Sequence, residues 1–283
     1  MKLKIKRYIS QVFFLFFANI GFKINNLFNS KTGLCYPFFY CHSCPAATSA
    51  CPIRAVEESL YNGFFEGKIN LKLLLYPLAI IGFVGTISGR AVCGWVCPIG
   101  FLQRLTGKVA RRLKKYPVFN KIGSCKIECY LRYMKYFLFI GLVVLTAYFI
   151  GFMFTNICPV GFLVGTLPIA IINPGGYYPG EYFYVALVIF ILFFILIFTV
   201  ERGWCKYFCP VGAMLAPFNK ISMIYVSVDK EKCIHCNACT EICPMGIDIP
   251  NMSRSPECIL CGKCIDVCPK NIIKFEGYKV LKK

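Results

Sequence analysis

One cysteine block occurs twice in this chain, and the repeat constrains the fold more than any other feature. The first copy is CGWVCPIG at residues 93–100, and the second is CKYFCPVG at residues 205–212. Flanking residues keep the same offset, since Arg90 precedes the first block as Arg202 precedes the second. Two apolar segments separate the copies, which would return the chain to the same face of a membrane. The pattern predicts a duplicated metal-cluster motif.

Composition indicates that much of the chain contacts lipid. Of the 283 residues, 57% are hydrophobic and only 16% are charged, against about 25% charged in average proteins. A soluble chain of this size would need more polar surface, so the apolar excess is expected to contact a bilayer. The net charge of +19 is interpreted as the cation excess of cytoplasmic loops and as compensation for anionic clusters. Nucleic acid is not an expected partner, because the cations lie between apolar segments.

About four transmembrane helices are predicted from the apolar segments. The third segment has 19 nearly unbroken apolar residues, about 28 Å as a helix, which suits a bilayer core. Cations concentrate in residues 1–7 and 90–135, which predicts that these residues and the C-terminal tail lie in the cytoplasm. The expected protein is therefore a multi-pass protein of the cytoplasmic membrane. The four segments are residues 8–22, 71–88, 136–154 and 182–200.

The C-terminal tail has the cysteine spacing of a bacterial two-cluster ferredoxin. It contains two runs with the spacing C-x2-C-x2-C-x3-C-P, in which the last cysteine of each run ligates the other cluster. Two 4Fe–4S clusters are therefore predicted, and two zinc knuckles are the disfavoured alternative. The ligands of one cluster would be Cys233, Cys236, Cys239 and Cys268, and those of the other would be Cys243, Cys258, Cys261 and Cys264.

These observations predict two domains. Residues 1–228 would form an all-α transmembrane domain, with an internal pseudo-repeat whose halves lie at about residues 35–130 and 150–220. Residues 229–283 would form a small α+β ferredoxin domain in the cytoplasm.

Cys-Pro dipeptides recur where apolar helices are expected to begin. Proline suits the first position of a helix, so the preceding cysteine would lie at a helix N-terminus, where the dipole favours a thiolate. Seven of the nineteen cysteines are followed directly by proline. Iron–sulfur ligation shows this habit, whereas disulfide scaffolds have no need of it.

The remaining cysteines are expected to hold one to two further 4Fe–4S clusters. The quasi-symmetric choice on the cytoplasmic side is a cluster on Cys93, Cys97, Cys205 and Cys209. Cys125 and Cys129 have the same C-x3-C spacing without proline and could contribute to a second cluster on that side. On the opposite side, Cys41, Cys44, Cys51 and Cys158 are expected to hold a cluster, with Cys35 spare, and two disulfides are the alternative.

The paired CGWVCPIG and CKYFCPVGA blocks, followed by the two-cluster tail, resemble the NapH/NosR/CcoG group of membrane-bound polyferredoxins. The resemblance covers roughly residues 70–275. It implies a four-helix membrane anchor and electron transfer between a quinone pool or redox partner and a chain of iron–sulfur clusters. Residues 35–52 and the CPVG at residue 158 are extra to the pattern of the nitrate-reductase member.

Absent motifs narrow the chemistry. His42 and His235 are the only histidines, which excludes a di-haem cytochrome with four histidine ligands, and no C-x-x-C-H haem attachment site occurs. No G-x-G-x-x-G follows an expected strand, so a nucleotide domain is unsupported. Glu57 and Glu58 are interpreted as solvated residues, and a proton relay to a quinone is the alternative.

The predicted function is that of a membrane-integral iron–sulfur electron-transfer subunit of an oxidoreductase complex. It would pass electrons between the tail and the clusters of the first domain, to or from a quinone or a partner complex. Expected partners are membrane lipid and redox subunits, with a quinone or a soluble ferredoxin as candidates. The alternatives are an assembly or metal-reducing factor for a respiratory oxidase, and a redox sensor.

Overall fold

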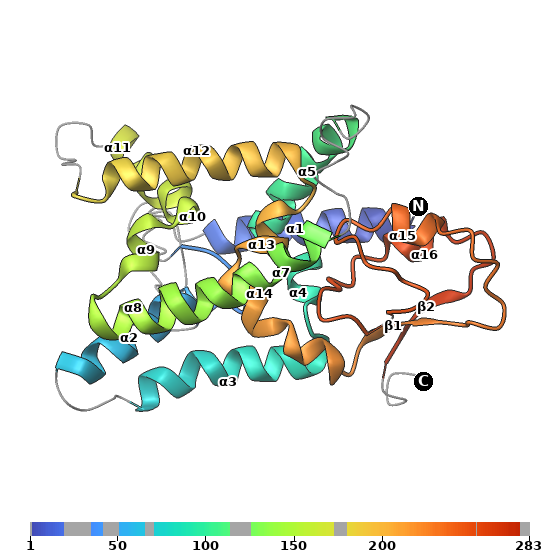
Figure 1. The fold of residues 1–283 in the computed structure, drawn as a ribbon, viewed down its shortest axis with the longest axis horizontal. Helices are drawn as coiled ribbons and strands as arrows, with labels where there is room; N and C mark the ends of the chain where they lie inside the picture. The colour runs from blue at the N-terminus through green and yellow to red at the C-terminus, as the bar shows by residue number, and fades with distance from the viewer. Residues whose placement is uncertain are drawn as a thin grey trace.

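The computed structural model describes residues 2–19, 35–41, 51–65, 71–113, 126–172, 180–252 and 254–277. Helices fill most of the molecule, and a two-stranded sheet lies at the end that holds the C-terminal tail (Figure 1). Long helices run roughly along the long axis of the molecule, with α12 on one side and α3 on the other (Figure 1).

Five helices precede the first gap after the first cysteine block. Proline starts two of them, α2 and α5, as the Cys-Pro pattern predicts. Helix α1 packs on α4 and α5, and α3 packs on α2. The five helices are α1 (Lys2–Asn19), α2 (Pro52–Phe65), α3 (Leu71–Ser88), α4 (Ala91–Trp95) and α5 (Pro98–Leu113).

The middle of the chain forms two helical passages. The first begins as α7 (Lys126–Leu138), continues through a π-helical stretch η2 (Phe139–Leu145) and ends as α8 (Thr146–Phe149). The second contains α9 (Met153–Ile157), α10 (Pro159–Gly161), the π-helical stretch η3 (Phe162–Thr166), α11 (Leu167–Ile172) and then the apolar helix α12 (Phe183–Thr199).

The second cysteine block repeats the local structure of the first. A short helix, α13 (Gly203–Tyr207), ends just before the second cysteine of the block, and the proline after that cysteine starts α14 (Pro210–Leu215). Helices α4 and α5 have the same relation to the first block. A 3-10 turn, η4 (Pro217–Lys220), then leads into the tail.

The tail is closed by one pair of antiparallel strands. Strand β1 (Tyr225–Val228) pairs with β2 (Ile273–Glu276), with Tyr225 opposite Glu276. Two short helices, α15 (Ala238–Glu241) and α16 (Lys263–Val267), pack on each other between the strands in sequence. Strand β1 lies just before residue 229, at which the tail domain was expected to begin, so the strand pair includes residues from both sides of that boundary.

The prediction of about four transmembrane helices is wrong. In the described ranges, one helix, Tyr130–Phe149, is long and apolar enough to cross a membrane. Three other apolar helices, Leu74–Ser88, Pro159–Ile172 and Phe183–Thr199, are shorter than the roughly 20 residues of a typical span. The hydropathy pattern also assigned to one predicted span residues that belong to separate helices. The predicted segment 136–154 is interrupted at Gly151, whose φ of +119° ends the helix.

A buried polar network joins the helices to the tail. Arg90 forms a 2.9 Å ion pair with Glu257, and Lys135 binds the other oxygen of the same carboxylate. The amide of Asn219 donates to the carbonyl of Cys258 at 2.7 Å, while its oxygen accepts the backbone N–H of Arg90 at 2.7 Å. Because these groups are buried and paired, the tail is held in a fixed position against the first cysteine block.

Candidate metal centres

The tail brings its eight cysteines together around two cavities. The first three cysteines of each run line the same cavity as the last cysteine of the other run. Apolar residues of β1 and of the loops after it line both cavities, and Ile273 of β2 lines the first. One cavity is lined by Cys233, Cys236, Cys239 and Cys268, and the other by Cys243, Cys258, Cys261 and Cys264. These are the two sets that the spacing predicts as ligands.

Backbone amides approach the sulfur atoms of the tail. The amides of Met245 and Ile247 hydrogen-bond to Cys243, and the amide of Leu260 hydrogen-bonds to Cys258. Burial nevertheless raises the pKa of the Cys258 thiol to about 12. A multivalent iron core would stabilise the four cysteines of a set as thiolates, so the donor set fits a cluster.

The paired blocks place their four cysteines in one buried group. The four are Cys93, Cys97, Cys205 and Cys209, and each is no more than 6% exposed. They lie close enough to interact electrostatically, since the other three all contribute to the raised pKa of the Cys209 thiol after burial itself. The quasi-symmetric grouping expected from the repeat is therefore present in space.

Two arginines are exchanged between the blocks. Arg202, which precedes the second block, donates to the carbonyl of Cys93 at 2.8 Å. Arg90, which precedes the first block, donates to the carbonyl of Cys205 at 3.1 Å. Both side chains are buried. Two guanidinium groups beside four thiols would offset the negative charge of an iron–sulfur cluster held there.

Donors to the sulfur atoms come from the helices that follow each block. The amide of Gly100 lies 3.5 Å from the Cys97 sulfur, and that of Gly212 lies 3.4 Å from the Cys209 sulfur. Both glycines leave room for an arginine, because a Cβ at Gly100 would lie 2.8 Å from an Nη of Arg202. The equivalent distance from Gly212 to Arg90 is 3.0 Å.

Gln103 is a site residue that the sequence analysis missed. Its side-chain amide donates to the Cys205 sulfur at 3.2 Å, and its oxygen accepts the backbone N–H of Cys205 at 3.4 Å. Gln103 is fully buried one turn into α5, whereas Cys205 belongs to the other block. A single glutamine has no distinctive spacing, so only its burial between two cysteine blocks reveals the role.

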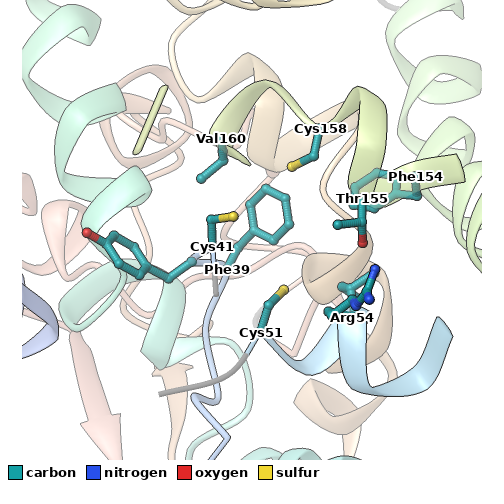
Figure 2. A pocket seen from close by; sticks show the side chains of 10 residues that line it. Phe39, Cys41, Cys51, Arg54, Phe154, Thr155, Cys158 and Val160 are labelled. Carbon is teal, nitrogen blue, oxygen red and sulfur yellow. The ribbon is translucent and has the colours of Figure 1, made fainter. Parts of the chain in front are cut away.

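A third group of cysteines surrounds a separate cavity. Figure 2 shows the sulfur atoms of Cys41, Cys51 and Cys158 pointing toward the same space, beside the ring of Phe39. Cys51 precedes α2 and Cys158 precedes α10, so two helix N-termini meet here. None of the three forms a disulfide with another described cysteine. Cys44, the fourth member of the expected set, lies outside the described residues.

Glu57 is buried, contrary to its interpretation as a solvated residue. It lies one and a half turns after Cys51 in α2, and it has no exposed surface. Thr155, which lines the same cavity as Cys51, donates a hydrogen bond to Oε2 of Glu57. The other carboxylate oxygen of Glu57, Oε1, is buried and has no hydrogen-bond partner among the described residues. Burial raises the pKa of the Glu57 carboxyl to about 7, although the bond from Thr155 opposes the shift.

The cysteine groups follow one another through direct contacts. Trp95, in the first block, donates to the carbonyl of Leu260 at 2.8 Å, between two tail cysteines. Gly94 touches the same tail segment so closely that a Cβ there would overlap the carbonyl oxygen of Ile259. On the far side of the block, the Cys97 thiol lies 3.9 Å from the carbonyl of Phe39, whose ring lines the third cavity.

Several residues singled out in the sequence do not belong to any described cysteine group. Cys125 lies outside the described residues, as does the side chain of Cys129, so a cluster that recruits them stays a prediction. Cys35 is buried and its thiol faces the carbonyl of Tyr36 at 3.8 Å. His235 is exposed in a left-handed turn with φ of +51°, and His42 is not described.

Single-ion geometry is absent from the described ranges, where no three Cys, His, Asp or Glu side chains could hold one metal ion. A cubane cluster takes one thiolate at each of four iron atoms, so its ligands lie farther apart than those of a single ion. The cysteine-lined cavities, together with the cysteine spacing of the tail, indicate an iron–sulfur protein.

Comparisons with known proteins agree with this class. A family model described as a 4Fe–4S binding domain matches residues 69–117 and 182–225, and one described as a 4Fe–4S dicluster domain matches residues 218–281. The first covers both cysteine blocks and the second covers the tail. No solved structure matches the chain.

Three relatives define the family. An uncharacterized protein of Methanocaldococcus jannaschii is 30% identical over 255 residues, which cover 88% of this chain and 85% of that protein. The ferredoxin-type protein NapH of Escherichia coli is 28% identical over 68% of this chain. The methylamine utilization ferredoxin-type protein MauN of Methylobacillus flagellatus is 26% identical over 66% of this chain. The chain spans 58% of the length of NapH and of MauN.

The chain belongs to the NapH-like family of ferredoxin-type 4Fe–4S proteins, which confirms the resemblance found in its motifs. It is an iron–sulfur protein with a role in electron transfer.

Proposed function

We propose that this protein carries electrons through four cysteine sets arranged in series and exchanges them with redox partners at both ends. A 4Fe–4S cluster bound at each set would supply one-electron transfer. The order of the sets is the single observation that carries the proposal. Contacts of Gly94 and Trp95 join the tail to the paired blocks, and Phe39 joins the paired blocks to the third cavity.

The proposed ligands are the cysteines grouped by the cavities. The two tail sets would hold two clusters, with one cysteine of each run exchanged between them. Cys93, Cys97, Cys205 and Cys209 would hold the third, and Cys41, Cys44, Cys51 and Cys158 would hold the fourth. Burial of the described members of the third and fourth sets supports this assignment, because water around a cluster stabilises its more charged, reduced state and changes its potential.

Buried cations support an anionic group at the paired blocks. Arg90 and Arg202 are both within hydrogen-bond distance of cysteine carbonyls there, and Arg90 is additionally paired with Glu257. Because an isolated buried guanidinium is costly, a negatively charged cluster beside the two arginines would stabilise the folded protein.

Exposed apolar side chains support membrane association. On one side of α12, Tyr184, Val188, Leu192 and Ile195 are each more than half exposed, whereas Phe193 on the other side is 2% exposed. Soluble monomers rarely expose so continuous an apolar stripe. We propose that this stripe contacts lipid, and that the tail lies on the cytoplasmic side. The proposal concerns lipid contact and does not require four crossings.

The helix with the length of a span supports the same proposal. Only 17% of the Tyr130–Phe149 window is buried in the protein. Flotation of the cluster-loaded protein with liposomes tests lipid contact. Recovery of the protein in the lipid-free fraction without detergent would overturn it.

The proposed partners are a redox protein at the tail and a quinone or redox subunit beyond the third cavity. The tail lies at one end of the molecule (Figure 1), and this position supports a protein partner there. Cys236 and Ile234 of the tail are exposed, so a partner could approach this cavity closely.

Two cysteine variants test whether the third cavity binds a cluster. Replacement Cys158→Ala should remove one reduced-cluster signal from the anaerobic EPR spectrum and leave the tail signals unchanged. Cys35→Ala is the matched control, because Cys35 is also buried but has no place in the four sets. An unchanged spectrum for Cys158→Ala, with full iron content, would overturn the fourth site.

A further inference from the structure

A large cavity outside the cysteine sites lies where the N-terminal helix meets the tail. Its volume is about 580 Å³, within the range of pockets that bind small molecules. It is lined by residues of α1, α5 and α16, together with Ile242. Figure 1 shows the N-terminal end of α1 beside α15 and α16, at the junction between the helices and the tail.

The lining of this cavity is strongly basic. It contains six cationic side chains and one acidic side chain, Asp266. Lys263 and Arg111 share one carboxylate, that of Glu201, at 2.6 and 3.5 Å. In the described part of the chain, the ammonium groups of Lys4 and Lys108 have no carboxylate within ion-pair distance. The six cations are Lys4, Arg7, Arg104, Lys108, Arg111 and Lys263.

Two arginines in the cavity are held by neutral groups. Arg7 is 3% exposed and donates to the carbonyl of Cys261, but its Nε is buried without a partner. Arg104 donates to the side chain of Gln11 at 2.9 Å and lies over the ring of Tyr8. Burial and the charge of Arg7 lower the pKa of Arg104 to about 10. An anion in the cavity would relieve this repulsion.

An apolar stripe leads away from the cavity along α1. Ile5 lines the cavity, and Ile9, Phe13 and Phe16 follow at helical spacing. These four side chains are between 52% and 68% exposed. Leu105 and Val109 on α5 are also exposed, at 46% and 42%. If the cations of the cavity served only to offset the negative charge of a nearby cluster, no apolar stripe would be needed beside them.

We propose that the cavity binds the phosphate of an anionic phospholipid, with the acyl chains along the α1 stripe. The arginines present paired N–H donors that match phosphate oxygens, and the two unpaired lysines add charge at the rim. The apolar stripe on α1 would then contact the acyl chains of the lipid. The shared chemistry is a phosphate anion, which a soluble phosphate could also supply, so the experiment separates the two sources.

Calorimetric titration of the anaerobic, cluster-loaded protein with dihexanoyl phosphatidylglycerol tests the inference. This lipid can be used as a monomer, so the result does not depend on binding to a bilayer, which flotation tests separately. We expect saturable binding at least about tenfold tighter than that of dihexanoyl phosphatidylcholine, because the zwitterionic headgroup loses net charge-assisted contacts. Equal affinity for the two lipids would overturn the site. Equal affinity for inorganic phosphate or glycerol phosphate would overturn the lipid assignment.

Matched charge variants locate the binding site. The double substitution Lys4→Gln/Lys108→Gln should weaken phosphatidylglycerol binding at least about tenfold. Lys230→Gln/Lys274→Gln removes the same charge from exposed positions on the tail and should leave binding unchanged. All four replaced lysines are exposed, so both proteins should fold and keep the cluster absorbance of the wild type. Equal loss in both double variants would reduce the effect to net charge and overturn the site.

Discussion

Arg202 donates a 2.8 Å hydrogen bond to the carbonyl of Cys93, 109 residues earlier in the chain. Arg90 makes the equivalent bond to Cys205 in the opposite direction, at 3.1 Å. Each half of the repeat therefore supplies the arginine that binds the other half's cysteine block. Separation of the halves would break both bonds, so the two blocks form one site.

Removal of one exchanged arginine should weaken that site. Arg202→Ala leaves the Cys93 carbonyl without its donor and removes a buried cation beside the four thiols. We expect a loss of about 1–3 kcal/mol of folding stability and a lower iron content. Arg112→Ala is the control, because Arg112 is exposed on α5. Anaerobic thermal unfolding followed by cluster absorbance measures both, and equal midpoints for the two variants would contradict the structural role of the exchange.

A methyl group at Gly94 should disturb the junction between the tail and the paired blocks. Gly94→Ala places a Cβ against the carbonyl oxygen of Ile259, and overpacking against backbone costs about 1–3 kcal/mol. The control is Gly82→Ala in α3, where a Cβ would meet nothing within 4 Å. We expect slower electron transfer from the tail to the paired blocks in stopped-flow reduction of the first variant alone. Unchanged kinetics in Gly94→Ala would mean that this contact is not the junction.

Loss of the carboxylate at Glu257 should be among the most destabilising changes of a single charge. Glu257→Gln leaves the buried cations of Arg90 and Lys135 without the negative charge that they share, and breaking a buried ion pair costs about 3–5 kcal/mol. Asp229→Asn breaks an exposed pair with Lys232 and should change the unfolding midpoint little. Chemical denaturation under anaerobic conditions compares them. Similar midpoints would show that the network contributes little to stability.

The buried Glu57 carboxyl should make stability depend on pH. Its pKa is raised from 4.5 to about 7, so between these values the folded protein keeps a proton that the unfolded chain releases. The contribution of Glu57 to the free energy of unfolding should therefore be fully present below about pH 4.5. It should fall by up to about 3 kcal/mol as the pH rises through 7. Glu57→Gln should flatten this part of the profile of unfolding midpoint against pH, with Glu58→Gln as control. Parallel profiles for wild type and Glu57→Gln would contradict the assignment.

Cysteine spacing anticipated which thiols meet, whereas hydropathy did not anticipate the path of the helices. Tail cysteines such as Cys243 and Cys268 line the opposite run's cavity, as expected. That these sets bind clusters remains a prediction. The number of spans was wrong because a hydropathy window does not show where a helix ends, and three of the apolar helices are shorter than the roughly 20 residues of a typical span.

Long-range polar contacts were beyond sequence reasoning. Burial of Glu57 depends on Thr155, which is distant in sequence, and nothing in either local sequence marks the pair. Gln103 contacts Cys205 in the same way, through a tertiary arrangement that the repeat alone does not specify. Arg90 and Arg202 were visible as repeated residues, but their exchange between halves required the folded structure.

Iron and acid-labile sulfide per polypeptide, measured on anaerobically purified full-length protein, test the central claim most directly. Four cysteine sets predict about sixteen iron atoms and sixteen sulfides, since each cluster contains four of each. About eight of each would confine the clusters to the tail. That result would contradict the proposal that the paired blocks and the third cavity bind clusters.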